Sequence, residues 1–116
     1  AAVAAVDLEG EGRAEQARHP GGVNVEFAAV AGPGRLRIRT WERGVGETRA
    51  CGSGSCAAAA AARAWGLVGD VVEVENPGGV VRVELPVAGG RDDVVLTGPA
   101  QYVATVEVPV EVPVRP

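Results

Sequence analysis

The sequence has very few aromatic residues: Phe27, Trp41, Trp65 and Tyr102 are the only ones among 116. A core without large rings must be filled by small and β-branched side chains, and valine and alanine dominate the 47% of residues that are hydrophobic. Valine favours strands, whereas alanine favours helices. The composition therefore indicates an α+β domain that combines a sheet with one alanine-rich helix.

Concentrated positive charge and long apolar runs are also lacking. The net charge is −4, and the eleven basic residues, all arginine, form no cluster beyond the alternating Arg35, Arg37 and Arg39. This distribution argues against a nucleic acid partner. No apolar run approaches the ~20 residues that cross a bilayer, and no three-part signal peptide opens the sequence. We therefore expect no membrane partner and a soluble, cytoplasmic protein.

Metal-ligating residues are equally scarce. Cys51 and Cys56 are the only cysteines and His19 is the only histidine, which is too few for a zinc site, so we expect no metal. If the chain is helical from Ser53 onward, the two cysteine side chains point to different faces, which disfavours a disulfide. We interpret Cys56, which begins an alanine run, as a packing residue and His19 as a surface residue.

Methionine is absent, even at position 1. We therefore expect this chain to be a segment or a processed product of a longer protein. A chain of 116 residues is long enough for one domain with a core, but barely long enough to enclose a whole substrate alone. We expect a single domain over residues 1–116 that shares its ligand with a second part.

Turn residues divide the sequence into short segments. A polar helix is predicted over residues 7–19, and an alanine-rich helix, central and mostly buried, over 53–65 before Gly66. Alternating and valine-rich segments predict strands at residues 23–30, 35–41, 71–75, 80–87, 94–97 and 102–108. Prolines recur in residues 109–116, which predicts a loose tail. Tight turns between strands indicate an antiparallel sheet, curved and wrapped around the alanine-rich helix.

Cys51 stands between a charged segment and a glycine-serine turn that opens into the alanine run. Unpaired backbone N–H groups at a helix start favour a thiolate, and they also bind anions. Gly52 and Gly54 leave the backbone open to a ligand, and Ser53 can cap the helix or donate from its hydroxyl. The segment therefore predicts a reactive thiol beside an anion site, although a buried cysteine in an ordinary turn gives the same pattern.

Four segments resemble, in order and spacing, the C-terminal half of diaminopimelate epimerases: VNVEF at 23–27, WERGVGETRACGSGSCAAAA at 41–60, PGG at 77–79 and LTGPA at 96–100. The resemblance implies one half of a two-domain fold. It also implies a cofactor-independent enzyme that interconverts LL- and meso-2,6-diaminopimelate for lysine and peptidoglycan synthesis. In that family, two cysteines face each other across the substrate α-carbon. Cys51 matches the second cysteine, and the first belongs to an N-terminal half-domain.

The resemblance also implies roles for neighbouring residues. Glu42 is expected to influence the cysteine and to contact the substrate, so it is a catalytic and a binding candidate. Asn24 and Arg43 would bind the distal end of the substrate, where a guanidinium suits a carboxylate. Gly52 and Ser53 would hold the reacting carboxylate through backbone N–H groups. Glu47 and Thr48 are interpreted as loop-shaping residues, with Glu47 accepting hydrogen bonds from backbone N–H groups.

Two other functions stay open at this level. Proline racemases and phenazine-biosynthesis isomerases share the two-half fold, although the adjacent Glu42 and Arg43 favour a substrate with a second charged end. An isolated half without its partner cysteine would instead be an anion-binding module without turnover. The sequence is also compatible with a homodimer.

Overall fold

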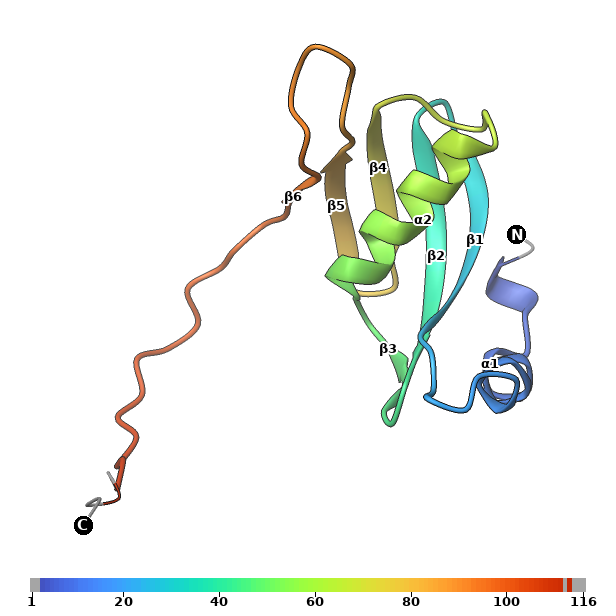
Figure 1. Cartoon of the computed structure of the whole chain (residues 1–116). Coiled ribbons are helices and arrows are strands. Elements are labelled where there is room, and N and C mark those ends of the chain that lie inside the picture. Colours follow the sequence, from blue (N-terminus) through green and yellow to red (C-terminus); the bar gives the residue numbers. More distant parts are fainter. Residues whose placement is uncertain (1–2, 112, 114–116) are drawn as a thin grey trace.

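The computed structural model describes residues 3–111 and 113. A six-stranded sheet has the order β1-β2-β4-β5-β6 (Figure 1). The sixth strand, β3, pairs with residues 40–42 at the end of β2. The elements in chain order are the 3-10 helix η1 (Val3–Ala5), α1 (Leu8–Ala17), β1 (Val25–Gly32), β2 (Arg35–Glu42), β3 (Gly46–Thr48), α2 (Gly52–Ala64), β4 (Val71–Asn76), β5 (Gly79–Glu84) and β6 (Val95–Thr97). The predicted α+β class is confirmed.

The core lies between α2 and one face of the sheet. Successive strand residues point to opposite faces, so β2 turns Leu36 and Ile38 toward α2 and its arginines away from it. Alanines on one side of α2 pack onto this face together with valines from β4 and β5. The buried set is Leu36, Ile38, Ala58, Ala59, Ala62, Val72, Val74, Val83 and Leu85. Small helix side chains allow this close approach between the helix and the sheet.

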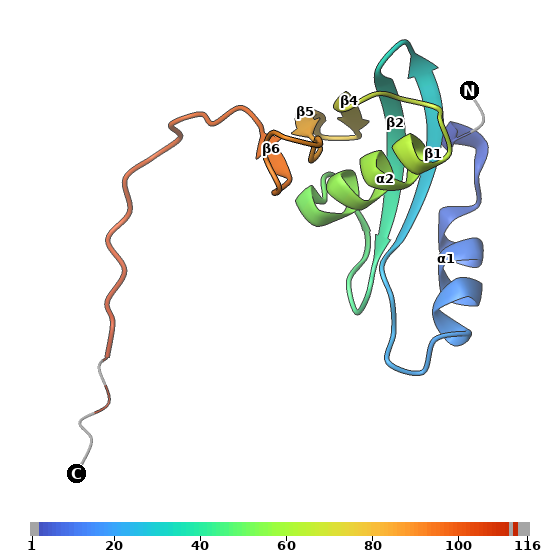
Figure 2. The ribbon, with the colours of Figure 1, turned by 45° about the horizontal axis from the view of Figure 1, so that its top comes forward.

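Two details of the sheet differ from the sequence prediction. The pairing of β2 with β4 is parallel, with Arg35 opposite Glu73 and Arg37 opposite Glu75, whereas the other pairs are antiparallel. The prediction of an antiparallel sheet was wrong for this pair because α2 forms a crossover between the two strands, and a crossover returns the chain in the same direction. The sheet is also open, and α2 covers one face of it without being enclosed (Figure 2).

The other α-helix, α1, packs on the face of the sheet that α2 does not cover. A Cβ at Gly12 of α1 would collide with the Trp41 ring, and the Arg13 guanidinium lies 5.5 Å from the centre of that ring. Figure 2 shows β1 and β2 between the two helices. Nearby, the Arg39 guanidinium donates to the carbonyl oxygens of Val3 and Val6 and thereby ties η1 to β2.

Residues beyond β6 run away from the sheet (Figure 1). The predicted strand at 102–108 does not form: these residues have no assigned secondary structure, and Tyr102 and Val103 are 80% and 87% exposed. The prediction was wrong because alternating valines favour a strand only where a neighbouring strand supplies hydrogen bonds. Of the residues predicted as a loose tail, 109–116, residues 109–111 and 113 are exposed and have no assigned secondary structure, and the others lie outside the described residues.

Among residues 3–111 and 113, no helix combines the length and the apolar character needed to cross a membrane.

Candidate active site

Cys51 is the N-cap residue of α2. Its backbone is extended, with φ −138° and ψ 110°, and its sulfur accepts a hydrogen bond from the Gly54 N–H at 3.3 Å. The side chain is nearly buried, at 8% exposure. The predicted position of this thiol at a helix start is therefore observed. An N-cap acceptor receives the partial positive charge of the helix end, which is the arrangement that stabilises a developing thiolate.

The first turn of α2 leaves donors free for a ligand. The Ser55 N–H makes the first intrahelical bond, to the carbonyl oxygen of Cys51, so the N–H groups of Gly52 and Ser53 precede the hydrogen-bond ladder. Ser53 is exposed, and its hydroxyl lies 3.6 Å from the Cys51 sulfur. Of the two roles considered for Ser53, capping is excluded, because Cys51 itself occupies the cap position and α2 begins one residue earlier than predicted.

Glu42, at the end of β2, accepts a hydrogen bond from the Thr48 hydroxyl at 2.7 Å. The pairing of Thr40 with Thr48 brings β3 beside this end of β2, so the Thr48 side chain points to the face that α2 covers. Thr48 therefore orients the Glu42 carboxylate, a specific role that the general interpretation as a loop-shaping residue did not include. The Thr40 hydroxyl is buried on the same face and is the one buried side-chain N or O atom without a hydrogen-bond partner among the described residues.

Glu26 is a second carboxylate near the start of α2, and the sequence analysis missed it. It pairs with Thr40 across β1 and β2, so its side chain points to the α2 face. Burial, and then the charge of Glu42, raise the pKa of Glu26 above its usual range. The signal that could have drawn attention to Glu26 was its position two residues after Asn24, because alternation along the predicted strand at 23–30 would place both on one face.

Asn24 and Arg43 are brought together by a hydrogen bond. The Arg43 backbone N–H donates to the Asn24 side-chain oxygen at 2.8 Å, and the Arg43 guanidinium donates to the Gly21 carbonyl oxygen at 3.0 Å. Both residues are exposed. Two residues predicted to share one end of a substrate are thus neighbours, although they stand nineteen positions apart in the sequence.

Glu47 lies on the other face of the sheet from Cys51. The Arg39 guanidinium donates to both of its carboxylate oxygens, at 2.9 and 3.1 Å, and this bond lowers the pKa of Glu47. The prediction that Glu47 accepts from backbone N–H groups was wrong. Strand alternation places Glu47 on the same face of the sheet as the arginines of β2, and Arg39 binds it there. The predicted surface position of His19 is confirmed by its exposure, and the ring lies 3.3 Å from Glu15.

Cys56 packs against the core, as predicted. Burial, and then the neighbouring Cys51, raise the pKa of the Cys56 thiol. Both cysteines are free. Within residues 3–111 and 113, no group of three histidine, cysteine, aspartate or glutamate side chains is placed to hold a metal ion.

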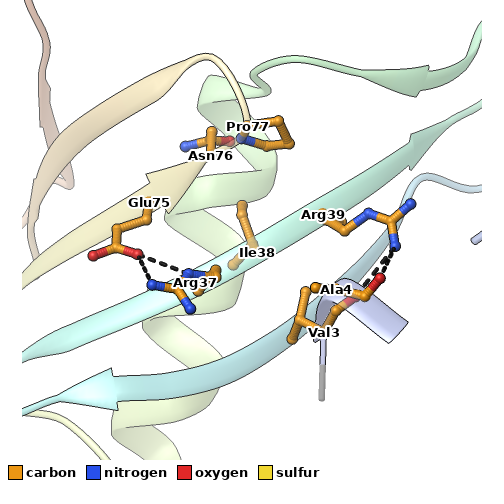
Figure 3. A pocket seen from close by; sticks show the side chains of 8 residues that line it. All are labelled: Val3, Ala4, Arg37, Ile38, Arg39, Glu75, Asn76 and Pro77. Carbon is orange, nitrogen blue, oxygen red and sulfur yellow. Dashed lines mark hydrogen bonds and ion pairs between the residues drawn. The ribbon is translucent and has the colours of Figure 1, made fainter. Parts of the chain in front are cut away.

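An open pocket of about 220 Å³ lies where β2, β4 and η1 meet (Figure 3). Arg37 forms an ion pair with Glu75 at one end, and at the other end Arg39 donates to carbonyl oxygens of η1. None of the predicted site residues lines this pocket. Asn76 and Pro77 border it from the turn between β4 and β5, and Asn76 also reaches the start of α2.

The fold and the site together define an α+β domain that presents a cysteine at a helix start, with a carboxylate and an arginine at the end of a neighbouring strand. The family model described as diaminopimelate epimerase matches residues 3–103. This chain belongs to the diaminopimelate epimerase family.

Individual relatives agree with this assignment. A diaminopimelate epimerase of Xylella fastidiosa (strain M23) is 48% identical over 101 residues, which are 87% of this chain and 35% of that protein. Another, of Xanthomonas axonopodis pv. citri (strain 306), is 49% identical over 89 residues, or 77% of this chain and 31% of that protein. A third, of Thioalkalivibrio sulfidiphilus, is 48% identical over 89 residues. The chain spans about a third of the length of the curated relatives it matches.

Proposed function

We propose that this chain supplies one half of a cofactor-independent diaminopimelate epimerase, which interconverts LL- and meso-2,6-diaminopimelate. The observation that carries the proposal is the Cys51 sulfur at the start of α2, 3.3 Å from the Gly54 N–H. The names of the relatives support the substrate. The second thiol comes from an N-terminal half-domain, consistent with the greater length of those relatives.

The reaction moves one proton across a stereocentre. One cysteine, as a thiolate, removes the α-proton and becomes a thiol, leaving a carbanion whose charge extends into the carboxylate. The other cysteine, as a thiol, donates its proton to the opposite face and becomes a thiolate. No proton is gained or lost overall, and Cys51 takes either part according to the direction of the reaction.

The start of α2 stabilises the charge that develops in this step. An α-proton beside a carboxylate is weakly acidic, so donors aimed at the carboxylate lower the barrier. The free N–H groups of Gly52 and Ser53 serve this purpose, since they come before the first intrahelical bond of α2. Glu42, oriented by Thr48, contacts the substrate and influences the thiol.

The distal end of the substrate carries a second amino acid group. We assign its carboxylate to the Arg43 guanidinium and its polar atoms to Asn24, because the two residues are joined by a hydrogen bond. A charged distal end favours diaminopimelate over proline. We place the reaction in the cytoplasm, where a reducing environment keeps catalytic cysteines free.

The test uses the complete protein with diaminopimelate in deuterated water, followed by NMR of the α-proton. We expect exchange and inversion in the unaltered protein, loss of inversion in Cys51→Ala, and near-normal activity in the matched control Cys56→Ala. Full inversion by Cys51→Ala would exclude Cys51 as an acid/base. Binding of diaminopimelate without any exchange would favour the anion-binding module, and exchange of proline alone would favour a proline racemase.

A further inference from the structure

The turn between β4 and β5, residues 76–79, packs directly against the segment that precedes α2. The Gly78 N–H donates to the Arg49 carbonyl oxygen at 2.6 Å. Two residues later, the Cys51 N–H donates to the side-chain oxygen of Asn76 at 3.4 Å. One turn, more than twenty residues away in sequence, thus makes hydrogen bonds on both sides of Ala50.

Asn76 also closes a ring of hydrogen bonds around the Cys51 backbone. Its side-chain N–H donates to the Ser55 hydroxyl oxygen at 3.1 Å, and the Ser55 hydroxyl donates to the Cys51 carbonyl oxygen at 2.8 Å. Ser55 is completely buried. The N–H and the C=O of Cys51 are therefore both held, so the direction of its Cα–Cβ bond is fixed and only rotation about χ1 remains to place the sulfur.

The contact of the 76–79 turn with this segment depends on glycine. A Cβ at Gly78 would lie 2.9 Å from the Arg49 carbonyl oxygen and 3.2 Å from the Arg49 Cβ. The first distance is shorter than real Cβ contacts, and the obstacle is backbone, which cannot move aside as a flexible side chain would. A larger residue would therefore push the turn away from the start of α2.

We propose that the 76–79 turn is a positioning element for the catalytic thiol, with Asn76 and Ser55 as its positioning residues. This inference rests on the proposed function. The hydrogen-bond partners of the Cys51 sulfur are Ser53 and Gly54, whereas Asn76 and Ser55 hold the peptide groups from which the side chain projects. The ring keeps the sulfur in line with the Gly54 N–H and, in the assembled enzyme, aimed at the α-carbon.

A purely structural role for Asn76 is the competing explanation, since asparagine before proline is common in turns. The two roles differ in what a substitution disturbs. Loss of a turn residue lowers the stability of the whole domain, whereas loss of the ring changes the environment of one thiol. Cys56 provides an internal reference, because it lies in the same helix and outside the ring.

The experiment measures alkylation by iodoacetamide between about pH 6 and 10, with each cysteine followed separately by peptide mass, in the complete protein. In Asn76→Ala and in Ser55→Ala, we expect Cys51 to be alkylated more slowly across this range, because its sulfur is no longer held beside the Gly54 N–H, while Cys56 keeps its rate. We expect kcat to fall by about 10- to 100-fold with little change in KM, the size of effect that a small misplacement of a reacting group produces. The control Val83→Ala removes buried core volume on β5 away from the ring, and it should lower stability without changing the alkylation rate of Cys51.

The ring also predicts non-additivity. Because each substitution breaks the same closed set of bonds, the double variant Asn76→Ala/Ser55→Ala should be hardly worse than Asn76→Ala alone. An unchanged alkylation rate of Cys51 in both single variants would overturn the proposal, and so would equal slowing at Cys51 and Cys56. If Asn76→Ala does not fold, Asn76→Asp, which keeps the acceptor for the Cys51 N–H, provides the measurement. The alkylation rates need no substrate, so a failure of the epimerase proposal would appear separately, as an absence of α-proton exchange.

Discussion

Glu26 and Cys51 approach the same residue, Gly54, from two different elements. A Cβ at Gly54 would collide with the Glu26 carboxylate and would lie 3.1 Å from the Cys51 sulfur. A carboxylate from β1 and the thiol of the helix cap therefore share the space above one glycine. This relationship explains why the first turn of α2 requires glycine at that position, and it places a partly buried carboxylate beside the thiol.

Gly54→Ala is predicted to destabilise the domain in spite of alanine's helix propensity. That propensity favours the substitution by about 1 kcal/mol, whereas the added methyl in a filled space costs about 1–3 kcal/mol. The collision should outweigh the propensity, because the added Cβ would be crowded by two groups, the Glu26 carboxylate and the Cys51 sulfur, so that moving one of them does not clear the space. Unfolding in urea, followed by circular dichroism, measures the difference.

Gly52→Ala is the matched control for Gly54→Ala, because it adds the same methyl group in the same turn. Its Cβ would meet only the Cδ2 atom of Leu96, 2.9 Å away, at the end of a flexible side chain. We expect a smaller loss of stability there. If Gly54→Ala proved as stable as Gly52→Ala, the crowding between Glu26 and Cys51 would be excluded as the reason for glycine.

Glu26→Gln should stabilise the domain at neutral pH. Burial, and then the charge of Glu42, raise the pKa of Glu26, so the folded state favours the protonated carboxyl. The stability that Glu26 contributes is fully present below about pH 4 and is lost as the pH rises through the raised pKa of the folded state. Glutamine has no charge to lose, so the gain from the substitution should be largest above that pKa and should disappear in acid.

Urea unfolding of both proteins at several pH values between about 4 and 8 measures this effect. Glu107→Gln removes the same charge from the exposed tail and serves as the control. A stability difference between Glu26→Gln and the unaltered chain that stays constant with pH would mean that the carboxylate is not penalised in the folded state.

The elements that could be predicted from the sequence are those with strong local signals. The helix at 53–65 was displaced by only one residue from the observed Gly52–Ala64, because an alanine run and Gly66 define it locally. The strand predicted at 102–108 failed, because pairing depends on a neighbour that no local pattern specifies. The parallel contact of β2 with β4 was missed for the same reason: it depends on where the α2 crossover returns the chain.

The residues of the candidate site also differ in how far they could be predicted from the sequence. Cys51, Glu42 and Arg43 belong to one contiguous segment, so a motif was enough to propose them as site residues. Asn76 and Glu26 reach the start of α2 from strands distant in sequence, and only the register of the sheet places them there. The asparagine directly before Pro-Gly-Gly was a local signal for a turn, but it gave no indication of which backbone that turn would contact.

Arg43→Ala is predicted to weaken diaminopimelate binding without changing the reactivity of the Cys51 thiol. The bond between Arg43 and Asn24 uses the backbone N–H of Arg43, so the alanine variant keeps that bond and removes only the guanidinium. A charge-assisted hydrogen bond is worth about 1.5–3 kcal/mol, which corresponds to a loss of affinity of about 10- to 100-fold. Asn24→Ala removes the acceptor that holds the Arg43 backbone, and we expect it to weaken binding as well.

Calorimetric titration of the complete protein with diaminopimelate, combined with alkylation of Cys51, separates the two properties. Arg49→Ala is the matched control: it removes the same charge from an exposed residue two positions before Cys51 and keeps the carbonyl oxygen that Gly78 binds. Equal loss of affinity in both variants would show that the arginines act through their general positive field. A parallel loss of Cys51 reactivity in Arg43→Ala would instead place the guanidinium in the environment of the thiol, because a residue that binds only the distal carboxylate leaves that environment unchanged.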